Sequence, residues 1–306
     1  MDKEEDKGFV AAYLNLSRKE LSLKIHQAFD LLRSCTLCPR KCMVNRTSGE
    51  HGFCRTLDKP YVSSWNPHFG EEAPLVGSRG SGTIFFTNCN LGCLFCQNYT
   101  ISHLGEGGEM SFEALADTML TLQKYGCHNI NFVTPTHQVP MILKSLEIAI
   151  DRGLSVPLVY NCGGYEALET LNILDGVIDI YMPDFKYADS EVANKYSKAK
   201  DYPSVVKAAI REMHRQVGDL VTDSRGIALR GLLVRHLVLP EGLAGTEEVV
   251  RFLAKEISPD TYTNIMAQYY PCYKAIEHPP MDRGLTNREY KEALEVARKA
   301  GLKRLD

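Results

Sequence analysis

Three closely spaced cysteines are the part of this sequence best suited to chemistry. Cys89, Cys93 and Cys96 form a C-x3-C-x2-C triplet directly after a short β-rich run. This spacing lets one loop wrap one iron–sulfur cluster, and three thiolates leave one iron of a 4Fe–4S cluster open to another molecule. A structural zinc knuckle usually closes with a fourth Cys or His, and ordinary buried thiols need no such intervals. The triplet therefore predicts a 4Fe–4S cluster with an open position.

Four further cysteines form a second group nearer the N-terminus. Their spacing is C-x2-C-x3-C-x11-C, at Cys35, Cys38, Cys42 and Cys54. Four thiolates can close either a structural zinc site or a second 4Fe–4S cluster. The pattern does not decide between these two, and dispersed free thiols are a third interpretation. A cluster would suit electron relay, whereas zinc would only staple the fold. The remaining cysteines are scattered and have no assigned role: Cys127, Cys162 and Cys272.

Composition excludes several classes of protein. The 306 residues carry 35 Lys and Arg against 38 Asp and Glu, and 44% are hydrophobic, which is enough for a sizeable core. No apolar run approaches the roughly 18 residues that cross a bilayer, and the first ten residues are charged where a signal peptide is apolar. We expect a soluble, cytoplasmic protein. The near-neutral charge, without basic runs, argues against nucleic acid as the main partner.

The segment before position 82 is predicted to be a separate N-terminal unit, residues 1–81. Ser17 and Glu20 form a capping box, and apolar residues follow at helical spacing, so residues 1–33 are expected to lead in with a helix. From 35 to 80 the chain is broken by many Pro and Gly residues. Order there would have to come from metal ligation or from packing on a neighbour, which indicates a cysteine-rich, metal-binding extension.

Beyond position 82 the pattern alternates between β-rich and helical segments. Strands are predicted at 83–87, 129–134, 156–160, 177–182, 231–239 and 262–267. Helices are predicted at 111–125, 138–151, 165–174, 189–197, 202–217, 246–257 and 286–300, the last with a capping box of Thr286 and Glu289. Such alternation gives an α/β fold, either an open doubly wound sheet or a full or partial barrel. In each of these the site lies at the carboxyl ends of the strands.

The triplet, with Phe95 immediately before its third cysteine and a strand before the loop, resembles the radical S-adenosylmethionine (SAM) superfamily. Seven segments resemble more narrowly the PflX-type branch, named for its similarity to pyruvate formate-lyase activating enzymes. They are CTLCPRKC (35–42), GEHGFC (49–54), GTIFFTNC (82–89), NFVTPTH (131–137), YNCGG (160–164), YMPDFK (181–186) and MAQY (266–269). The resemblance implies a partial (βα)6 barrel over 82–306, ending in a helix. In it the open iron binds the amino and carboxylate groups of SAM.

The same resemblance implies the chemistry. One-electron reduction of the cluster cleaves the sulfonium of SAM to methionine and a 5′-deoxyadenosyl radical, which abstracts a hydrogen atom. The cofactor carries out this step, while the barrel positions SAM and excludes water and competing reactions. Flavodoxin or ferredoxin is the reductant that the resemblance implies.

The resemblance also implies roles for individual residues. Cys89, Cys93 and Cys96 would ligate the cluster, and Phe95 would lie beside the adenine. Members of the superfamily usually place a Gly-Gly-Glu motif for the SAM ammonium after the second strand, where this chain has Thr134-Pro135-Thr136-His137. Hydroxyl and carbonyl oxygens can accept from an ammonium group, so Thr134, Thr136 and His137 are candidates for that contact. His137 is equally well read as a residue at a helix start.

Five further candidates lie in or after the later strands. Asn161, followed by Gly163 and Gly164, suits ribose binding, although Asn-x-Gly is also a common turn. Asp184 and Lys186 lie two apart on one face of an extended segment, where the resemblance directs them toward SAM and the substrate. A surface ion pair is the alternative for these two.

Arg235 interrupts an apolar strand, and a buried charge needs a partner, for which a SAM carboxylate or Asp184 is expected. Gln268, at the end of the last strand, completes the candidates for cofactor binding.

Several functions fit these residues. The first is a radical SAM enzyme resembling glycyl-radical activases, acting on a backbone glycine of a protein partner. The second directs the same chemistry at a small molecule or another protein side chain. A third, of another class, is a non-catalytic iron–sulfur or zinc protein for electron transfer or scaffolding, against which the polar strand ends argue. Zinc-dependent nucleic-acid binding lacks both a basic patch and ligand histidines.

Overall fold

Parallel strands alternate with helices through most of the chain. The computed structural model describes residues 8–306. The central strands are β2 (Ser81–Phe86), β4 (Ile130–Val133), β5 (Leu158–Cys162), β6 (Ile180–Pro183), β8 (Ala228–Leu237) and β9 (Tyr262–Met266). They are paired in parallel in that order, and β10 (Arg304–Leu305) adds to β9. All six strands predicted from the sequence are confirmed, with boundaries shifted by up to three residues.

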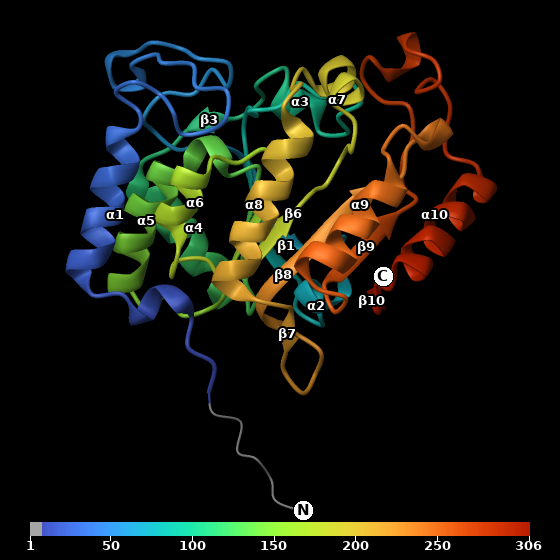
Figure 1. Ribbon diagram of the computed structural model, residues 1–306. Coiled ribbons are helices and arrows are strands. Elements are labelled where there is room, and N and C mark those ends of the chain that lie inside the picture. Colours follow the sequence, from blue (N-terminus) through green and yellow to red (C-terminus); the bar gives the residue numbers. More distant parts are fainter. Residues whose placement is uncertain (1–7) are drawn as a thin grey trace, which may run out of the picture.

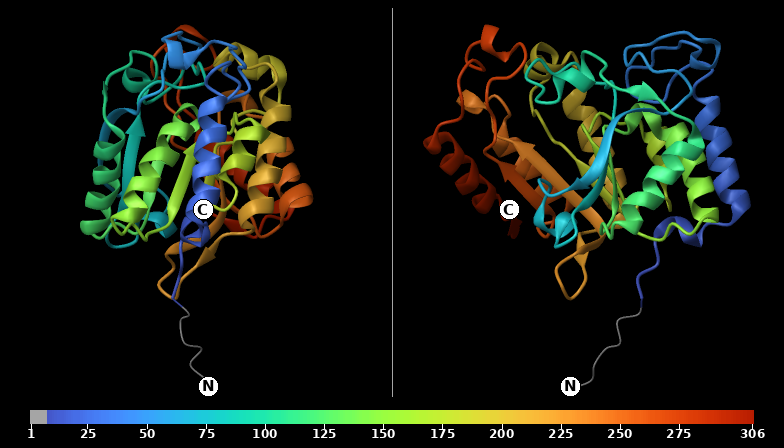
Figure 2. Two further views of the ribbon diagram at one scale, coloured as in Figure 1. Left: turned by 90° about the vertical axis from the view of Figure 1, so that its left-hand side faces the viewer. Right: turned by 180° about the vertical axis from the view of Figure 1, so that it is seen from behind.

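The helices cover one face of this curved sheet, and Figure 2 shows the strands exposed on the view from behind. They are α4 (Phe112–Lys124), α5 (Val139–Asp151), α6 (Leu168–Leu174), α7 (Ser190–Ser197), α8 (Tyr202–Val217), α9 (Thr246–Phe252) and α10 (Asn287–Ala300). A π-helical turn, Leu253–Ile257, continues α9. Every helix predicted after residue 82 is present, and the capping box of Thr286 and Glu289 begins α10. The α/β fold predicted from the alternation is confirmed, and its open, mostly parallel sheet is consistent with the partial barrel that the resemblance implies.

The N-terminal helix also begins where its capping residues predict. Ser17 caps α1 (Arg18–Asp30), and Glu20 returns the bond to the Ser17 backbone. This helix buries Leu21, Ile25 and Ala28 against the layer formed by α5 and α6. A short 3-10 turn, Ala12–Asn15, precedes it. The first seven residues of the predicted lead-in lie outside the described residues.

A strand lies within the stretch that the sequence left irregular. β1 (Tyr61–His68) runs antiparallel to β2 and extends the sheet beyond it, and the short β3 (Gly108–Glu109) pairs with β1. The prediction missed β1 because Pro67 and the glycines around it mask an exposed, irregular strand, whose register shifts between Val62 and Ser64. Order in this region therefore comes partly from sheet pairing.

The interior of the barrel is closed from below by the segment that follows β1. Residues 70–76 and the short α2 (Ala73–Val76) cross to the far strands, where Leu75 packs in a small inner core with Val159, Met182 and Leu233. The main core lies on the other side of the sheet, between strands and helices. We refer to residues 70–76 as the strap. Within residues 8–306, no helix combines the length and the apolar character that a membrane crossing requires.

Candidate active site

One cavity lies at the carboxyl ends of the parallel strands. It has a volume of about 370 Å³. Residues that follow β2, β4, β5, β6 and β8 reach it, as do residues of the strap. Its lining includes most of the residues singled out from the sequence: Cys89, Cys93, Phe95, Cys96, Thr134, Asn161, Gly163, Asp184, Lys186, Arg235 and Gln268. The topology thus brings together residues that are up to 179 positions apart in sequence, since Cys89 and Gln268 share one wall.

The three cysteines of the triplet occupy the loop between β2 and α3 (Tyr99–Ser102). Each sulfur has a nearby polar group. The Ser197 hydroxyl donates to Cys93 Sγ at 2.9 Å, and the Leu91 amide donates to Cys89 Sγ at 3.3 Å. Ser102 Oγ lies 3.1 Å from Cys96 Sγ. Donors of this kind stabilise thiolates, the form in which cysteine binds metal.

The electrostatics of the triplet fit a bound cationic cluster. Burial, followed by the neighbouring Cys93, raises the pKa of Cys89 and of Cys96. Three thiolates at this place therefore need positive charge to compensate them, and iron supplies it. A 4Fe–4S cluster takes each thiolate on a different iron, so its ligands need not converge on one ion. Among residues 8–306, no group of three or more His, Cys, Asp or Glu side chains is arranged to hold a metal ion. The metal-ligand roles of both cysteine groups stay predictions.

Phe95 gives the cavity an aromatic wall beside the triplet. It is 6% exposed and packs edge-on against Tyr269 at 5.9 Å and Tyr187 at 6.3 Å between ring centroids. Gln268 lies near Phe95. The backbone carbonyl of Gln268 accepts from the side-chain amide of Gln97 at 3.2 Å. This apolar wall suits a flat ring such as adenine.

A network of charged side chains lines another part of the cavity. Arg235 donates through Nε to Asp184 Oδ1 at 2.9 Å and through Nη2 to Asn161 Oδ1 at 2.7 Å. Lys186 Nζ donates to the other Asp184 oxygen at 2.6 Å. Glu71, on the strap, lies 3.3 Å from Arg235 Nη1. Of the two partners expected for Arg235, Asp184 is therefore present, and the pair with Lys186 is largely buried rather than a surface ion pair.

These contacts fix the charge states of the network. Burial alone would raise the pKa of Asp184, yet Arg235 and Lys186 hold that pKa below its ordinary value. Burial would likewise lower the pKa of Lys186, but Asp184 raises it above the ordinary value. Both side chains are charged at neutral pH, in an environment where charges act strongly on a ligand.

A glycine lets two of these strand ends approach each other. Gly164 has φ +76°, and a Cβ there would lie 2.3 Å from the Asp184 carbonyl oxygen. The Tyr202 hydroxyl donates to that same carbonyl at 2.8 Å and accepts from the Lys186 amide at 2.9 Å. The Gly-Gly pair noted in the sequence therefore serves close backbone packing that positions Asp184 and Lys186.

Thr136 and His137 lie outside the cavity lining. Thr134, which does line it, has φ +58°, and the chain then turns into a 3-10 helix that directs the next side chains into the outer layer. The Thr136 hydroxyl donates to Glu166 at 2.7 Å. His137 Nε2 lies 2.8 Å from the Thr87 carbonyl oxygen, and burial lowers the pKa of this imidazole to about 3. The structure thus gives both residues protein partners instead of a place in the cavity.

Two buried carboxyl groups were missed by sequence reasoning. Glu71 lines the cavity from the strap, a region with no strand-end signal. Glu166 accepts from Thr136 and from the Tyr160 hydroxyl, the latter at 2.9 Å, and burial raises its pKa to about 7. Its position two residues after a Gly-Gly pair marks a turn and carries no sign of burial.

The cysteine-rich extension holds the triplet loop from outside. None of its cysteines lines the cavity. Burial raises the pKa of Cys38 to about 12, and Cys54 and Cys35 lie near enough to raise that pKa further. Arginines between these cysteines contact the triplet loop and the segment after β4. Arg40 Nε donates to the Asn90 carbonyl oxygen at 2.9 Å, and Arg46 Nη2 donates to the His137 carbonyl oxygen at 2.9 Å.

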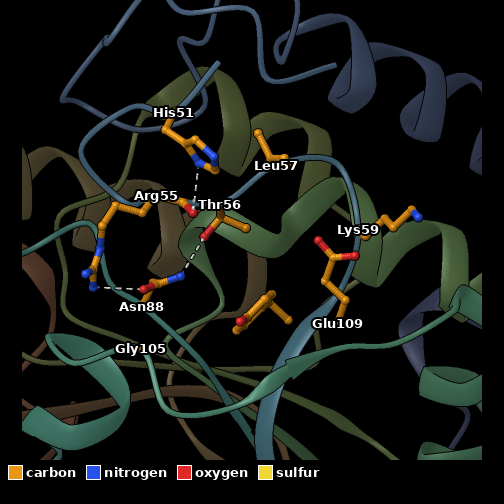
Figure 3. Close-up of a pocket in the computed structure, with 9 residues that line it drawn as sticks. His51, Arg55, Thr56, Leu57, Lys59, Asn88, Gly105 and Glu109 are labelled. Atoms are coloured by element: carbon orange, nitrogen blue, oxygen red, sulfur yellow. Dashed lines mark hydrogen bonds between the residues drawn. The ribbon is translucent and has the colours of Figure 1, made fainter. Parts of the chain in front are cut away.

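Arg55 makes the third of these contacts. Figure 3 shows its guanidinium directed at Asn88, the residue before Cys89, with an Nη2 to Oδ1 distance of 2.9 Å. The two residues border a second pocket of about 230 Å³, which His51, Thr56 and other extension residues line. The extension therefore packs directly on the loop that carries the triplet.

Comparison with known proteins agrees with this geometry. The profile of the radical SAM superfamily matches residues 83–227, from β2 to the start of β8. The chain contains a radical SAM superfamily domain. The match covers the triplet, Asn161, Asp184 and Lys186, whereas Glu71 and Arg235 lie outside it. It supports the superfamily and does not extend to the PflX-type branch.

Relatives of this radical SAM chain span nearly its full length. An uncharacterized protein of Methanocaldococcus jannaschii, MJ0674, is 35% identical over 291 residues, covering 92% of this chain and 79% of its own. A second from the same organism, MJ0808, is 23% identical over 268 residues, covering 80% and 73%. A radical SAM methyltransferase from Sphaerobacter thermophilus has a similar fold, with a TM-score of 0.50 and 13% identity over 73% of this chain. The match spans 65% of that protein, less than two thirds of its length.

Proposed function

We propose that this chain is an enzyme that reductively cleaves SAM and uses the resulting 5′-deoxyadenosyl radical to abstract a hydrogen atom from a substrate. The observation that carries the proposal is the shared cavity: the triplet thiols and the charged strand ends line the same space of about 370 Å³. A 4Fe–4S cluster, when bound by Cys89, Cys93 and Cys96, supplies the electron that breaks the sulfonium bond.

The protein's own residues bind and orient SAM. Arg235 is held by Asp184 and Asn161, which leaves Nη1 with only the 3.3 Å contact to Glu71. That N–H is available to a carboxylate, so Arg235 is the group to take the methionine carboxylate. Asn161 offers amide groups suited to ribose hydroxyls. Phe95 and the rings beside it would cover the adenine.

The walls also shield a reactive intermediate. Phe85, Phe86, Leu91 and Phe95 line the cavity with the triplet, and all but Phe85 are buried. Apolar walls of this kind keep water and stray polar groups from the radical. The arrangement thus suits a primary carbon radical directed at one substrate bond.

For the hydrogen donor we propose a backbone glycine of a protein partner, with flavodoxin or ferredoxin as the reductant, as the resemblance to activating enzymes implies. A small molecule or another protein side chain is the alternative substrate. The test is to incubate the reconstituted enzyme with a glycyl-radical polypeptide encoded beside its gene. A glycyl radical in the electron paramagnetic resonance (EPR) spectrum supports the protein substrate. A genome that lacks any such polypeptide contradicts it.

The test of the function itself is direct. Protein reconstituted anaerobically with iron and sulfide is mixed with SAM and dithionite, and 5′-deoxyadenosine is quantified by liquid chromatography and mass spectrometry. We expect both 5′-deoxyadenosine and methionine. Full iron loading without any SAM cleavage would overturn the proposal.

A further inference from the structure

The strap brings a carboxylate into the cavity from outside the superfamily domain. Glu71 precedes β2, where the superfamily match begins, yet it lines the cavity together with Arg235 and Asn161. Its side chain is 9% exposed. A carboxylate buried to this degree needs close donors or a cation to balance its charge.

The contacts of Glu71 are longer than those of the neighbouring carboxylate. Glu71 Oε2 lies 3.3 Å from Arg235 Nη1, and Oε1 lies 3.5 Å from Asn161 Nδ2. Asp184 instead accepts at 2.9 Å from Arg235 and at 2.6 Å from Lys186. Charge-assisted bonds between nitrogen and oxygen are normally 2.7–2.9 Å. Arg235 and Lys186 are thus already committed to Asp184, and Glu71 retains capacity to accept from a positively charged ligand.

The glutamate next to Glu71 does not share its place in the cavity lining. Glu72 accepts from Asn264 Nδ2 at 3.0 Å and does not line the cavity. It therefore belongs to the contact between the strap and β9. Of the two consecutive glutamates, one fastens the strap and the other faces the space where a ligand binds.

The segment expected to bind the SAM ammonium offers no carboxylate. Thr134 is the one residue of 134–137 that lines the cavity, since the Thr136 hydroxyl is engaged by Glu166 and His137 by Thr87. The amino group of SAM, in the neutral form that can bind the open iron, donates through its N–H bonds and requires acceptors close to it. In the described part of the lining the carboxylates are those of Glu71 and Asp184, and Asp184 already accepts two charged donors.

We propose that Glu71 is the carboxylate that accepts an N–H of the SAM amino group, in place of a motif after the second parallel strand. This rests on the proposed function. Arg235 Nη1 then exchanges its long contact with Glu71 for the methionine carboxylate, and Glu71 accepts from the amino group, so the Arg235 and Glu71 side chains each gain a closer partner. The strap is thereby part of the binding site as well as the floor of the barrel.

Ligand affinity tests this pairing directly. Dissociation constants are measured by equilibrium dialysis on reconstituted, unreduced protein, for SAM and for the SAM analogue that lacks the amino group. Wild-type protein should bind the analogue about tenfold to hundredfold more weakly, as expected for a lost charge-assisted bond. Glu71→Gln should bind SAM more weakly by a similar factor and should prefer SAM over the analogue by much less than the wild type does. Glu72→Gln is the matched control and should keep the wild-type preference.

The outcomes are distinguishable. If Glu71→Gln keeps the wild-type preference for SAM over the analogue, Glu71 only neutralises Arg235 and the proposal is wrong. If Glu71→Gln does not fold, as judged by circular dichroism, Glu71→Ala replaces it, and an unchanged preference in that variant overturns the proposal equally. Failure of the wild type to produce 5′-deoxyadenosine would instead reject the proposed function itself.

Discussion

The two cysteine groups of this protein are built in opposite ways. The triplet lies at the carboxyl ends of the parallel strands, lines the cavity, and receives hydroxyl and amide donors at its sulfurs. The quartet lies in the extension, and none of its sulfurs lines that cavity. Its local order comes from backbone bonds such as Cys35 N to Val44 O at 2.9 Å. The same residue type thus lines the cavity in one region and lies apart from it in the other.

Arginines of the extension connect the quartet to the triplet loop and to His137. Arg40, Arg46 and Arg55 lie between or beside the quartet cysteines and donate to Asn90, His137 and Asn88. His137 in turn bonds the carbonyl of Thr87, two residues before the first cysteine of the triplet. A metal in the extension would therefore stabilise the triplet loop without touching the ligand. This account predicts unequal effects of substitution in the two regions.

The largest effect is expected from Cys93→Ala. Losing one of three thiolates should abolish cluster binding at the triplet, and SAM cleavage should fall to the background of buffer without protein. Cys127→Ala is the matched control, because Cys127 is buried in the core and does not line the cavity. Iron content and 5′-deoxyadenosine are measured for both. Cleavage that survives in Cys93→Ala would show that the triplet is not the catalytic group.

Arg235→Met should be the most destabilising change within the charged wall. It leaves Asp184 and Glu71 buried with fewer partners, which should cost about 3–5 kcal/mol in the free energy of unfolding. Arg18→Met breaks an exposed ion pair with Asp151, with side chains 89% and 48% exposed, and should cost about 0–1 kcal/mol. Urea unfolding of both variants at equal metal content checks the contrast. Equal losses would mean that the network is not effectively buried.

Cys38→Ala tests the quartet in the same way that Cys93→Ala tests the triplet. The extension should lose its metal while the triplet keeps its iron, so SAM cleavage should fall by less than about tenfold, through loosening of the loop that Arg40 and Arg55 hold. Elemental analysis then identifies the metal. Loss of zinc with unchanged iron assigns a structural site, and loss of half the iron assigns a second cluster. Complete loss of cleavage with an intact triplet cluster would contradict a purely supporting role.

The smallest effect concerns Glu166, which lies between the two regions. Its pKa is about 7 in the folded chain against an ordinary 4.5, because burial disfavours its charge. The folded state therefore holds this proton more tightly than the unfolded chain, and the contribution to stability is lost as pH rises from about 4.5 through 7. Glu166→Gln should gain stability relative to wild type by at most about 3 kcal/mol between pH 5 and pH 8.

The check is urea unfolding at both pH values. The control is Glu169→Gln, which alters an exposed glutamate in the first turn of α6 and should show no such trend. A Glu166→Gln difference that stays constant with pH would mean that Glu166 is already ionised in the folded protein.

The parallel strands and the cavity residues could be predicted because each follows a local rule. Apolar runs mark the strands, Ser17 and Thr286 mark helix starts, and parallel topology gathers strand ends such as Asn161 and Asp184. What escaped prediction depends on contacts remote in sequence. Glu71 enters the cavity because Leu75 anchors the strap among β5, β6 and β8. Thr136 and His137 turn away because Thr134 adopts a left-handed backbone conformation, which no neighbouring Gly signals.

EPR of the reduced protein titrated with SAM tests most directly the claim that the triplet is the SAM-binding cluster and the quartet is its support. Samples of wild type, Cys38→Ala and Cys93→Ala are reconstituted and reduced in parallel. We predict that SAM changes the cluster spectrum of the wild type and of Cys38→Ala but leaves any remaining signal of Cys93→Ala unaltered. A SAM-dependent change that persists in Cys93→Ala and disappears in Cys38→Ala would contradict the account.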